Sequence, residues 1–283
     1  MAAIALALGC SVFWGLADFL GGLKSRTFPV PVVLCGMYLT SLIVMATFVA
    51  ARGTGPPATG AVVASLGAGV LGTLGLSAFY RALAIGTMSI AAPIAATGVA
   101  LPVLVGIATG DRPGLVRSIG LAAAVVGIVL ASREDDGGPV DALQQRQSAV
   151  LAVLAGLGFG SYFVLANIGS DGDIAWALLL SRVAGSPFVV AFALLAVRRG
   201  GRRPRGWEIA TLVGIGLIDL VANLAFNYAT TLGELSTVAV GSSLYPVMTV
   251  FMAALVLGER IRGIQRLGVV VALAAVVMIS AGG

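Results

Sequence analysis

The chain of 283 residues contains no histidine, and only 10% of its residues are charged. Without histidine, the chain cannot build a histidine-based metal site or use a histidine general base. Ordinary soluble domains carry roughly 25% charged residues, whereas this chain is 59% hydrophobic with a mean hydropathy of +1.05. The composition leaves no stretch that fits a soluble domain, and it predicts an all-α polytopic membrane protein.

Cysteine is also scarce, because Cys10 and Cys35 are the only two in the chain. Both stand inside apolar segments and at no motif spacing, so we interpret them as buried thiols rather than as a disulfide or a metal site. The stretch that ends at Cys10 faintly resembles a lipoprotein cleavage box. Since no basic residue precedes it, we interpret it as part of an uncleaved first helix.

Charges and clusters of glycine and proline divide the remaining sequence into apolar segments close to the roughly 20 residues that span a bilayer. We expect ten transmembrane helices, at 3–23, 30–50, 60–81, 86–109, 114–132, 148–168, 174–197, 207–229, 236–257 and 263–281. Between the fifth and sixth lies a polar stretch, 133–147, which we interpret as a linker. The predicted organisation is therefore two halves, 1–132 and 148–283.

The two halves share a sequence pattern. Four residues of the first half recur 147 positions later: Phe79, Ala82, Gly86 and Ser89 reappear as Phe226, Ala229, Gly233 and Ser236. A Gly-acid-Arg junction also occurs in each half, at Gly110 and at Gly258. Because five helices per half is an odd number, the second copy must enter the membrane in the opposite sense to the first. We therefore expect an inverted repeat, with a substrate site near the midplane between the halves.

An even number of spans puts both termini on one side of the membrane. Most lysines and arginines lie in the connections on the opposite side, and the positive-inside rule then places the termini outside. We interpret the net charge of +5 as a mark of topology and not of nucleic-acid binding.

The span 207–229 carries three polar residues, Asp219, Asn223 and Asn227, at four-residue spacing on one helical face. A carboxylate near the middle of a membrane is tolerated where it faces protein or water. We predict that the stripe lines a cavity, with Asp219 as a candidate for substrate or proton binding. The alternative is a structural hydrogen bond inside the bundle. Arg182 has two interpretations: it reaches the near interface, or it is the partner of a buried carboxylate.

The first helix offers a second carboxylate. Trp14 and Asp18 stand four residues apart on one face, as an aromatic wall and an acceptor, and Asp18 is a second candidate for proton coupling. Its alternative is a place near the interface, six residues before Lys24.

Two prolines are candidate hinges. Pro93 and Pro246 free the carbonyls of Ser89 and Ser242, which serve either as polar sites or as mere kinks. For the hydroxyls in these helices the alternative to substrate binding is a hydrogen bond back to the helix, and for Tyr162 it is ordinary packing. The predicted substrate-binding set is Trp14, Asp18, Tyr80, Ser89, Thr97, Tyr162, Asp219, Asn223, Asn227, Ser242 and Tyr245.

Several short motifs resemble one family. They are the Trp14-Gly15 pair, the run FYRALAIGTMSIAAPI at 79–94, and the TGDR and LGER junctions at Thr109 and Leu257. Together they resemble the EamA-type branch of the drug/metabolite transporter superfamily, and the resemblance covers essentially the whole chain. It implies a ten-helix transporter for small metabolites, often an exporter, with a central cavity between the halves.

We therefore expect a secondary transporter that moves an amino acid, an amine or a drug-like compound across the plasma membrane, here a bacterial inner membrane, by alternating access. No cofactor or metal is expected, and a monomer suffices because one chain holds both repeats. The alternatives are an intramembrane lipid-linked transferase and a non-transporting membrane protein. A transferase needs clustered acids or an activated nucleophile, whereas the only acidic cluster, 134–136, lies in the linker. The residues do not select a substrate.

Overall fold

The computed structural model describes residues 2–101, 105, 114–131, 141–170, 172–232, 242, 245–259 and 263–281. The regular elements within these ranges are all helical. They are α1 (Ala2–Ser25), α2 (Val30–Arg52), α3 (Thr59–Ile85), α4 (Met88–Ala96), the 3₁₀ turn η1 (Thr97–Val99), α6 (Leu115–Ala131), α7 (Ala142–Ser170), α8 (Ile174–Arg198), α9 (Trp207–Leu232), α11 (Tyr245–Leu257) and α12 (Gly263–Ala281). The prediction of an all-α protein is confirmed for the described chain.

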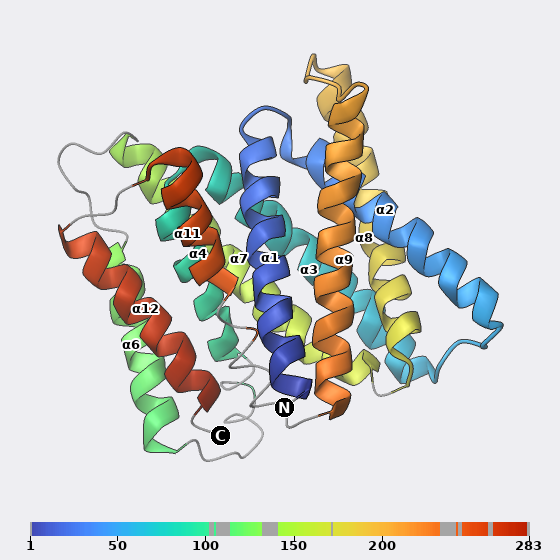
Figure 1. Ribbon diagram of the computed structural model, residues 1–283, viewed down its shortest axis with the longest axis horizontal. Helices are drawn as coiled ribbons and strands as arrows, with labels where there is room; N and C mark the ends of the chain where they lie inside the picture. The colour runs from blue at the N-terminus through green and yellow to red at the C-terminus, as the bar shows by residue number, and fades with distance from the viewer. Residues whose placement is uncertain are drawn as a thin grey trace.

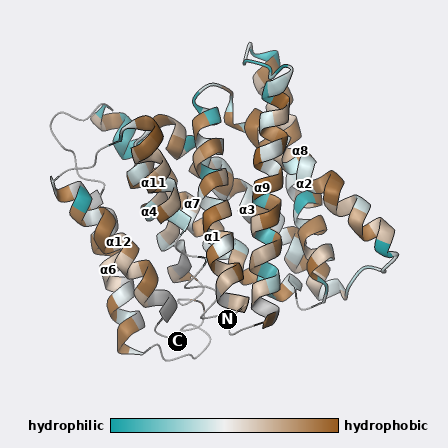
Figure 2. Cartoon of the chain, in the orientation of Figure 1, coloured by the Kyte–Doolittle hydropathy of each residue, from teal (hydrophilic) through white to brown (hydrophobic). Residues whose placement is uncertain are grey.

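Six of the described helices are long and apolar enough to cross a membrane, namely α1, α2, α3, α7, α8 and α9. Figure 2 shows hydrophobic residues along the sides of most helices and hydrophilic residues mainly toward their ends. Large apolar side chains such as Ile43, Leu74 and Leu255 are more than half exposed on the outer surface. Exposed apolar surface of this extent is expected where lipid covers the helices, so the chain is an integral membrane protein.

Two predicted boundaries differ from the structure. Helix α7 begins at Ala142, inside the stretch that composition assigns to the linker, because alanine, leucine, glutamine and arginine all favour helix. Within the same stretch, 133–140 lie outside the described residues. In the predicted fourth span, 86–109, helix α4 gives way to the 3₁₀ turn η1 at Thr97, and 102–104 and 106–109 lie outside the described residues.

Local chemistry explains how α2 and α8 are bounded. Helix α2 ends at Gly53, whose φ of +62° is the left-handed conformation typical of a C-terminal cap. Asp173 caps the start of α8 by accepting hydrogen bonds from the backbone of Ala175 (2.8 Å) and Trp176 (3.2 Å), and it pairs with Arg52 at 2.9 Å. Burial by itself raises the pKa of the Asp173 carboxyl, but these hydrogen bonds outweigh it and hold the pKa below its ordinary value.

The two halves of the sequence are interleaved in space (Figure 1). Helix α1 packs against α9, α2 against α8, α3 against α7 and α8, α4 against α7 and α11, and α6 against α12. Each of these pairs joins one helix from the first half with one from the second. Figure 1 also shows that α1 begins at the lower edge of the view, whereas α7 begins at the upper edge.

The contact between α3 and α7 depends on glycine. A Cβ on Gly158 would lie 2.5 Å from the Cα of Gly75 and 3.0 Å from the carbonyl oxygen of Leu71. These are backbone atoms that cannot turn aside, so the absence of a side chain is what lets the two helices approach. Gly214 in α9 is different, because nothing lies within 4 Å of a Cβ built there.

We predict that Gly158→Ala lowers the thermal unfolding temperature of the purified protein, because overpacking costs about 1–3 kcal/mol. Gly214→Ala is the matched control, and it should leave the unfolding temperature unchanged or raise it, since alanine is favoured over glycine inside a helix by about 0.5–1 kcal/mol. Equal unfolding temperatures for the two variants would contradict the close helix contact.

Candidate substrate pocket

A pocket with about 660 Å³ of empty space, counted out to its open mouth, lies between the two halves. Helices α1, α2 and α3 line it from the first half, and α7, α8, α9 and α11 line it from the second. The lining residues are Trp14, Asp18, Tyr38, Ala68, Gly69, Gly72, Leu76, Phe159, Tyr162, Phe163, Ser181, Arg182, Asp219, Asn223 and Tyr245.

An ion pair forms one wall of this pocket. The Nη2 atom of Arg182 on α8 lies 2.8 Å from the Oδ2 atom of Asp219 on α9, and each residue is only 9% exposed. The guanidinium also lies over the ring of Tyr38, 4.6 Å from its centroid, and the hydroxyls of Tyr38 and Thr73 are 3.0 Å apart. Of the two interpretations of Arg182, the structure agrees with the second: Arg182 is the partner of a buried carboxylate.

The polar stripe of α9 leads away from the ion pair. Asn223 donates from Nδ2 to the carbonyl oxygen of Asp219 at 2.7 Å, and its Oδ1 accepts from the Tyr162 hydroxyl at 3.3 Å. Asn227 donates to the carbonyl oxygen of Asn223 at 2.7 Å and accepts from Ser170 at 3.0 Å. Asp219 and Asn223 therefore belong to the pocket wall, whereas Asn227 joins α9 to the end of α7.

Asp18 faces the same pocket and is 9% exposed. Within the described part of the chain, its carboxylate has no hydrogen-bond or ion-pair partner. It does not sit with Lys24 at the interface, because the Lys24 ammonium lies over the ring of Trp207, 5.1 Å from its centroid. Asp18 and Asp219 instead repel each other electrostatically.

Aromatic side chains form the wall beside Asp18. The ring of Trp14 lies 5.4 Å from that of Phe226, 6.2 Å from that of Phe163 and 6.4 Å from that of Tyr245. Tyr162 continues the group, with its ring 5.7 Å from that of Phe163. These rings come from α1, α7, α9 and α11, so the aromatic cluster also joins the two halves.

The structure brings six of the predicted binding residues to the pocket, namely Trp14, Asp18, Tyr162, Asp219, Asn223 and Tyr245. Tyr80, Ser89, Thr97, Asn227 and Ser242 are described but do not line it. Tyr80 donates to the carbonyl oxygen of Ala17 at 3.3 Å, and Thr97 donates back to that of Ile94 at 2.7 Å, so their hydroxyls are engaged with backbone.

Sequence reasoning did not place Tyr38, Phe159, Phe163 and Ser181 in the pocket. The three rings are ordinary residues of apolar helices, and no sequence signal sets them apart. Of the candidate hinges, Pro93 lies inside α4, and Pro246 is the second described residue of α11. Their hinge role stays a prediction.

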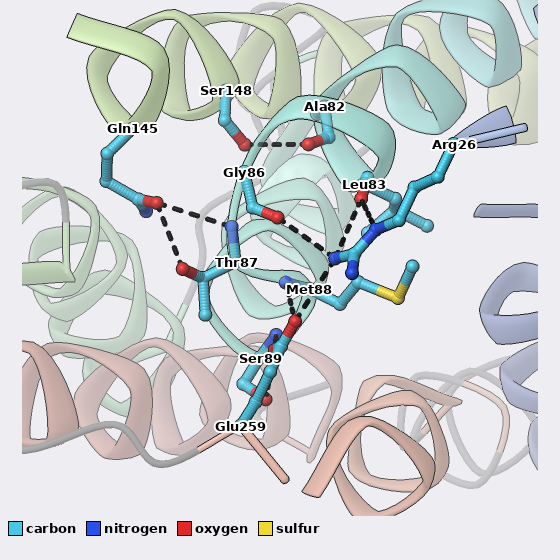
Figure 3. Close-up of polar contacts among 10 residues, drawn as sticks. All are labelled: Arg26, Ala82, Leu83, Gly86, Thr87, Met88, Ser89, Gln145, Ser148 and Glu259. Carbon is cyan, nitrogen blue, oxygen red and sulfur yellow. Dashed lines mark hydrogen bonds and ion pairs between the residues drawn. The ribbon is translucent and has the colours of Figure 1, made fainter. Parts of the chain in front are cut away.

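A second polar cluster lies at the end of the bundle where α3 turns into α4 (Figure 3). We call it the polar corner: residues 82–89 with Arg26, Gln145, Ser148 and Glu259. The Glu259 carboxylate accepts from the backbone N–H groups of Met88 (3.3 Å) and Ser89 (3.0 Å), and from the Ser89 hydroxyl (3.0 Å). It thus caps the start of α4, where the helix dipole favours a negative charge.

The remaining contacts of the polar corner hold the end of α3. Arg26 pairs with Glu259 at 3.2 Å and donates to the carbonyl oxygens of Leu83 (3.4 Å) and Gly86 (3.3 Å). From α7, Ser148 donates to the carbonyl oxygen of Ala82 at 2.9 Å, and Gln145 accepts from the backbone and hydroxyl of Thr87 at 3.3 and 3.1 Å. Three of these four side chains, Gln145, Ser148 and Glu259, come from the second half and hold a turn of the first.

The fold and the pocket define a helical integral membrane protein with charged groups buried between its two halves. Comparison with known families is consistent with this description, because the model of the EamA-like transporter family matches residues 1–133 and again 146–281. The chain therefore belongs to the EamA-like transporter family, a family of transporters rather than of enzymes. The resemblance seen in the sequence motifs is confirmed.

A solved crystal structure, described only as that of a protein, shares the fold. It superposes with a TM-score of 0.63 at 14% sequence identity, and the alignment covers 98% of this chain and 96% of the other. No curated protein matches the chain.

We predict that Asp219→Asn and Arg182→Gln each lower the unfolding temperature, because breaking a buried ion pair leaves an uncompensated charge at a cost of about 3–5 kcal/mol. The double variant should recover much of the loss, since it buries no unpaired charge at this wall. Thermal unfolding of the two single variants and the double variant gives the coupling between the sites. Additive losses would contradict the pairing.

Proposed function

We propose that the protein is a secondary transporter that moves a small metabolite through the pocket between its halves by alternating access. The observation that carries this proposal is the pocket itself, which both halves line and which holds an ion pair and a carboxylate without a partner. Ionisable groups inside a membrane protein mark pathways for substrates and ions. A site at the interface of two repeats is where secondary transporters bind their cargo.

Helix packing supports an inverted repeat of ten spans. If each helix of the first half is exchanged with its counterpart in the second, the pair α1 and α9 becomes α7 and α3, and the pair α2 and α9 becomes α8 and α3. The pairs α2 with α8 and α6 with α12 map onto themselves. All of these pairs are in contact. This exchange symmetry is what a two-fold axis between the halves produces, and such an axis lets one site face either side in turn.

The polar corner serves as the gate at one end of the pathway. Along α3 the pocket reaches Leu76 and the corner starts at Ala82, and between them the side chains of Phe79 and Tyr80 are fully buried. Access from this end therefore requires the contacts of Glu259, Gln145 and Ser148 to break. Hydrogen bonds and an ion pair at the edge of the bundle suit this task, because water replaces them at modest cost.

The charge distribution gives the orientation. Arg198 is exposed at the end of α8, and Arg199, Arg203 and Arg205 are exposed in the connection between α8 and α9. The contact of Lys24 with Trp207 places this connection at the same end as the polar corner. By the positive-inside rule this end faces the cytoplasm, so the gate closes the pocket on the cytoplasmic side and both termini lie outside. A monomer in a bacterial inner membrane acting as an exporter fits this arrangement.

We predict that the purified protein in liposomes accumulates at least one compound from a pool of labelled small metabolites above the level of empty liposomes. Ala68→Phe, which fills the pocket from α3, should abolish this uptake. Leu74→Phe places the same side chain on the lipid-facing side of α3, where Leu74 is 60% exposed, and should retain it. No uptake of any compound, or equal uptake by the two variants, would contradict transport through the pocket.

We predict that Glu259→Gln opens the cytoplasmic gate. A single cysteine at Ala68, in a chain with Cys10→Ala and Cys35→Ala, should react slowly with a membrane-impermeant maleimide added from the Arg26 side. The added Glu259→Gln should speed the reaction several-fold, because the neutral amide caps α4 and pairs with Arg26 more weakly. Glu208→Gln is the control at the same end, since Glu208 bonds only within its own loop, to Arg202 and Arg205. Equal rates in all three chains would exclude a gate at Glu259.

A further inference from the structure

We infer that the pocket takes an organic cation with a single positive charge and an aromatic or apolar body, with Asp18 as its counter-ion. This inference rests on the proposed transport function and narrows it to a class of substrate. It joins three observations: the balance of charge in the pocket, the missing partner of Asp18, and the rings around it.

When Asp18 is ionised, the lining of the pocket carries one net negative charge. Its lining contains two carboxylates, Asp18 and Asp219, and one guanidinium, Arg182. Arg182 and Asp219 neutralise each other across 2.8 Å, and Asp219 also abuts the Asn223 amide, which bonds to its backbone carbonyl. With those two groups paired, the charge that a ligand has to match is the charge of Asp18.

Asp18 has no partner among the described residues that could balance its charge. Only 9% of Asp18 is exposed. Within the described chain, no donor or cation contacts its carboxylate. A buried carboxylate without a partner is costly, so a cation that enters the pocket gains more from Asp18 than from an exposed acid.

The surroundings of Asp18 suit the rest of such a ligand. Trp14 stands one helical turn from Asp18 on α1, and the ring of Tyr245 lies 6.4 Å from that of Trp14 in the same pocket wall. Aromatic faces attract cations, most strongly where water is excluded. The same rings, with Phe159, Phe163 and Leu76, offer an apolar surface to the body of the ligand.

Anions and zwitterions fit this pocket less well. A ligand carboxylate needs a cation, and Arg182 is already paired with Asp219 and stacked on Tyr38. A zwitterion would have to compete with Asp219 for the guanidinium while it satisfies Asp18. An anion would meet Asp18 as well, as an added repulsion.

The test is a series of three ligands that share a phenyl group and differ in charge: benzyltrimethylammonium, phenylalanine and 3-phenylpropionate. Binding of each to the purified full chain in lipid nanodiscs is measured by calorimetry at one pH and salt concentration. We expect the cation to bind at least about tenfold more tightly than the zwitterion, and the anion to bind most weakly, because one uncompensated carboxylate decides the order. Tighter binding of the zwitterion or the anion, or no binding of the cation, overturns the inference.

Two variants locate the effect. Asp18→Asn should weaken the binding of benzyltrimethylammonium about tenfold or more, whereas Asp141→Asn, which neutralises an exposed carboxylate outside the pocket, should leave it unchanged. Unchanged affinity in Asp18→Asn overturns the role of Asp18. If Asp18→Asn does not fold, the order of the three affinities measured on the unmodified chain still tests the inference. Uptake of an anion or a zwitterion in place of the cation would contradict this inference but would still agree with the proposed transport function. No uptake of any compound would contradict the proposed function itself.

Discussion

The ion pair of Arg182 and Asp219 sets the arrangement of charge between the two halves. In a low-dielectric interior each charge is tolerated because the other is 2.8 Å away. The pair joins α8 to α9, and Tyr38 on α2 supports the guanidinium from one side. Because the two charges neutralise each other, this wall carries no net charge, although the Nε atom of Arg182 has no hydrogen-bond partner in the described chain. Asp18 is then the lining carboxylate without a partner among the described residues.

The two halves are interleaved, so the pocket wall is connected to helices of both halves. The pocket, the aromatic cluster and the polar corner are each built from both halves, so a movement of one half against the other changes all three together. Glycine contacts keep α3 and α7 close, whereas the polar corner is held by hydrogen bonds and one ion pair that water can replace. The two halves thus meet through close glycine contacts along the helices and through exchangeable polar contacts at one end.

Much of the fold could be predicted from the sequence. Long apolar segments indicate membrane spans, and recurring motifs indicate the two repeats. Asp18 and Asp219 were expected to face a cavity because each interrupts an apolar helix, and both line the pocket. Prediction failed where the facing of a side chain decides its role: Tyr80 and Thr97 bond to backbone outside the pocket. The pairing of Arg182 with Asp219 depends on how α8 and α9 are shifted along their axes relative to each other. The sequence positions of the two residues do not determine this shift. In the sequence, Glu259 was noted only as part of a junction motif. Its role at the start of α4 could not be predicted, because its partner Ser89 lies 170 residues away in sequence.

The central claim is that a transported compound sits between the two halves, against Asp18, while Arg182 and Asp219 stay paired. An experimental structure of the protein with a transported compound bound tests this claim most directly. We expect density for the compound between α1, α7 and α9, with its cationic group within hydrogen-bond or ion-pair distance of the Asp18 carboxylate and with the Arg182–Asp219 contact intact. Density for the compound elsewhere on the protein, or bound to Arg182 with Asp219 displaced, would contradict it.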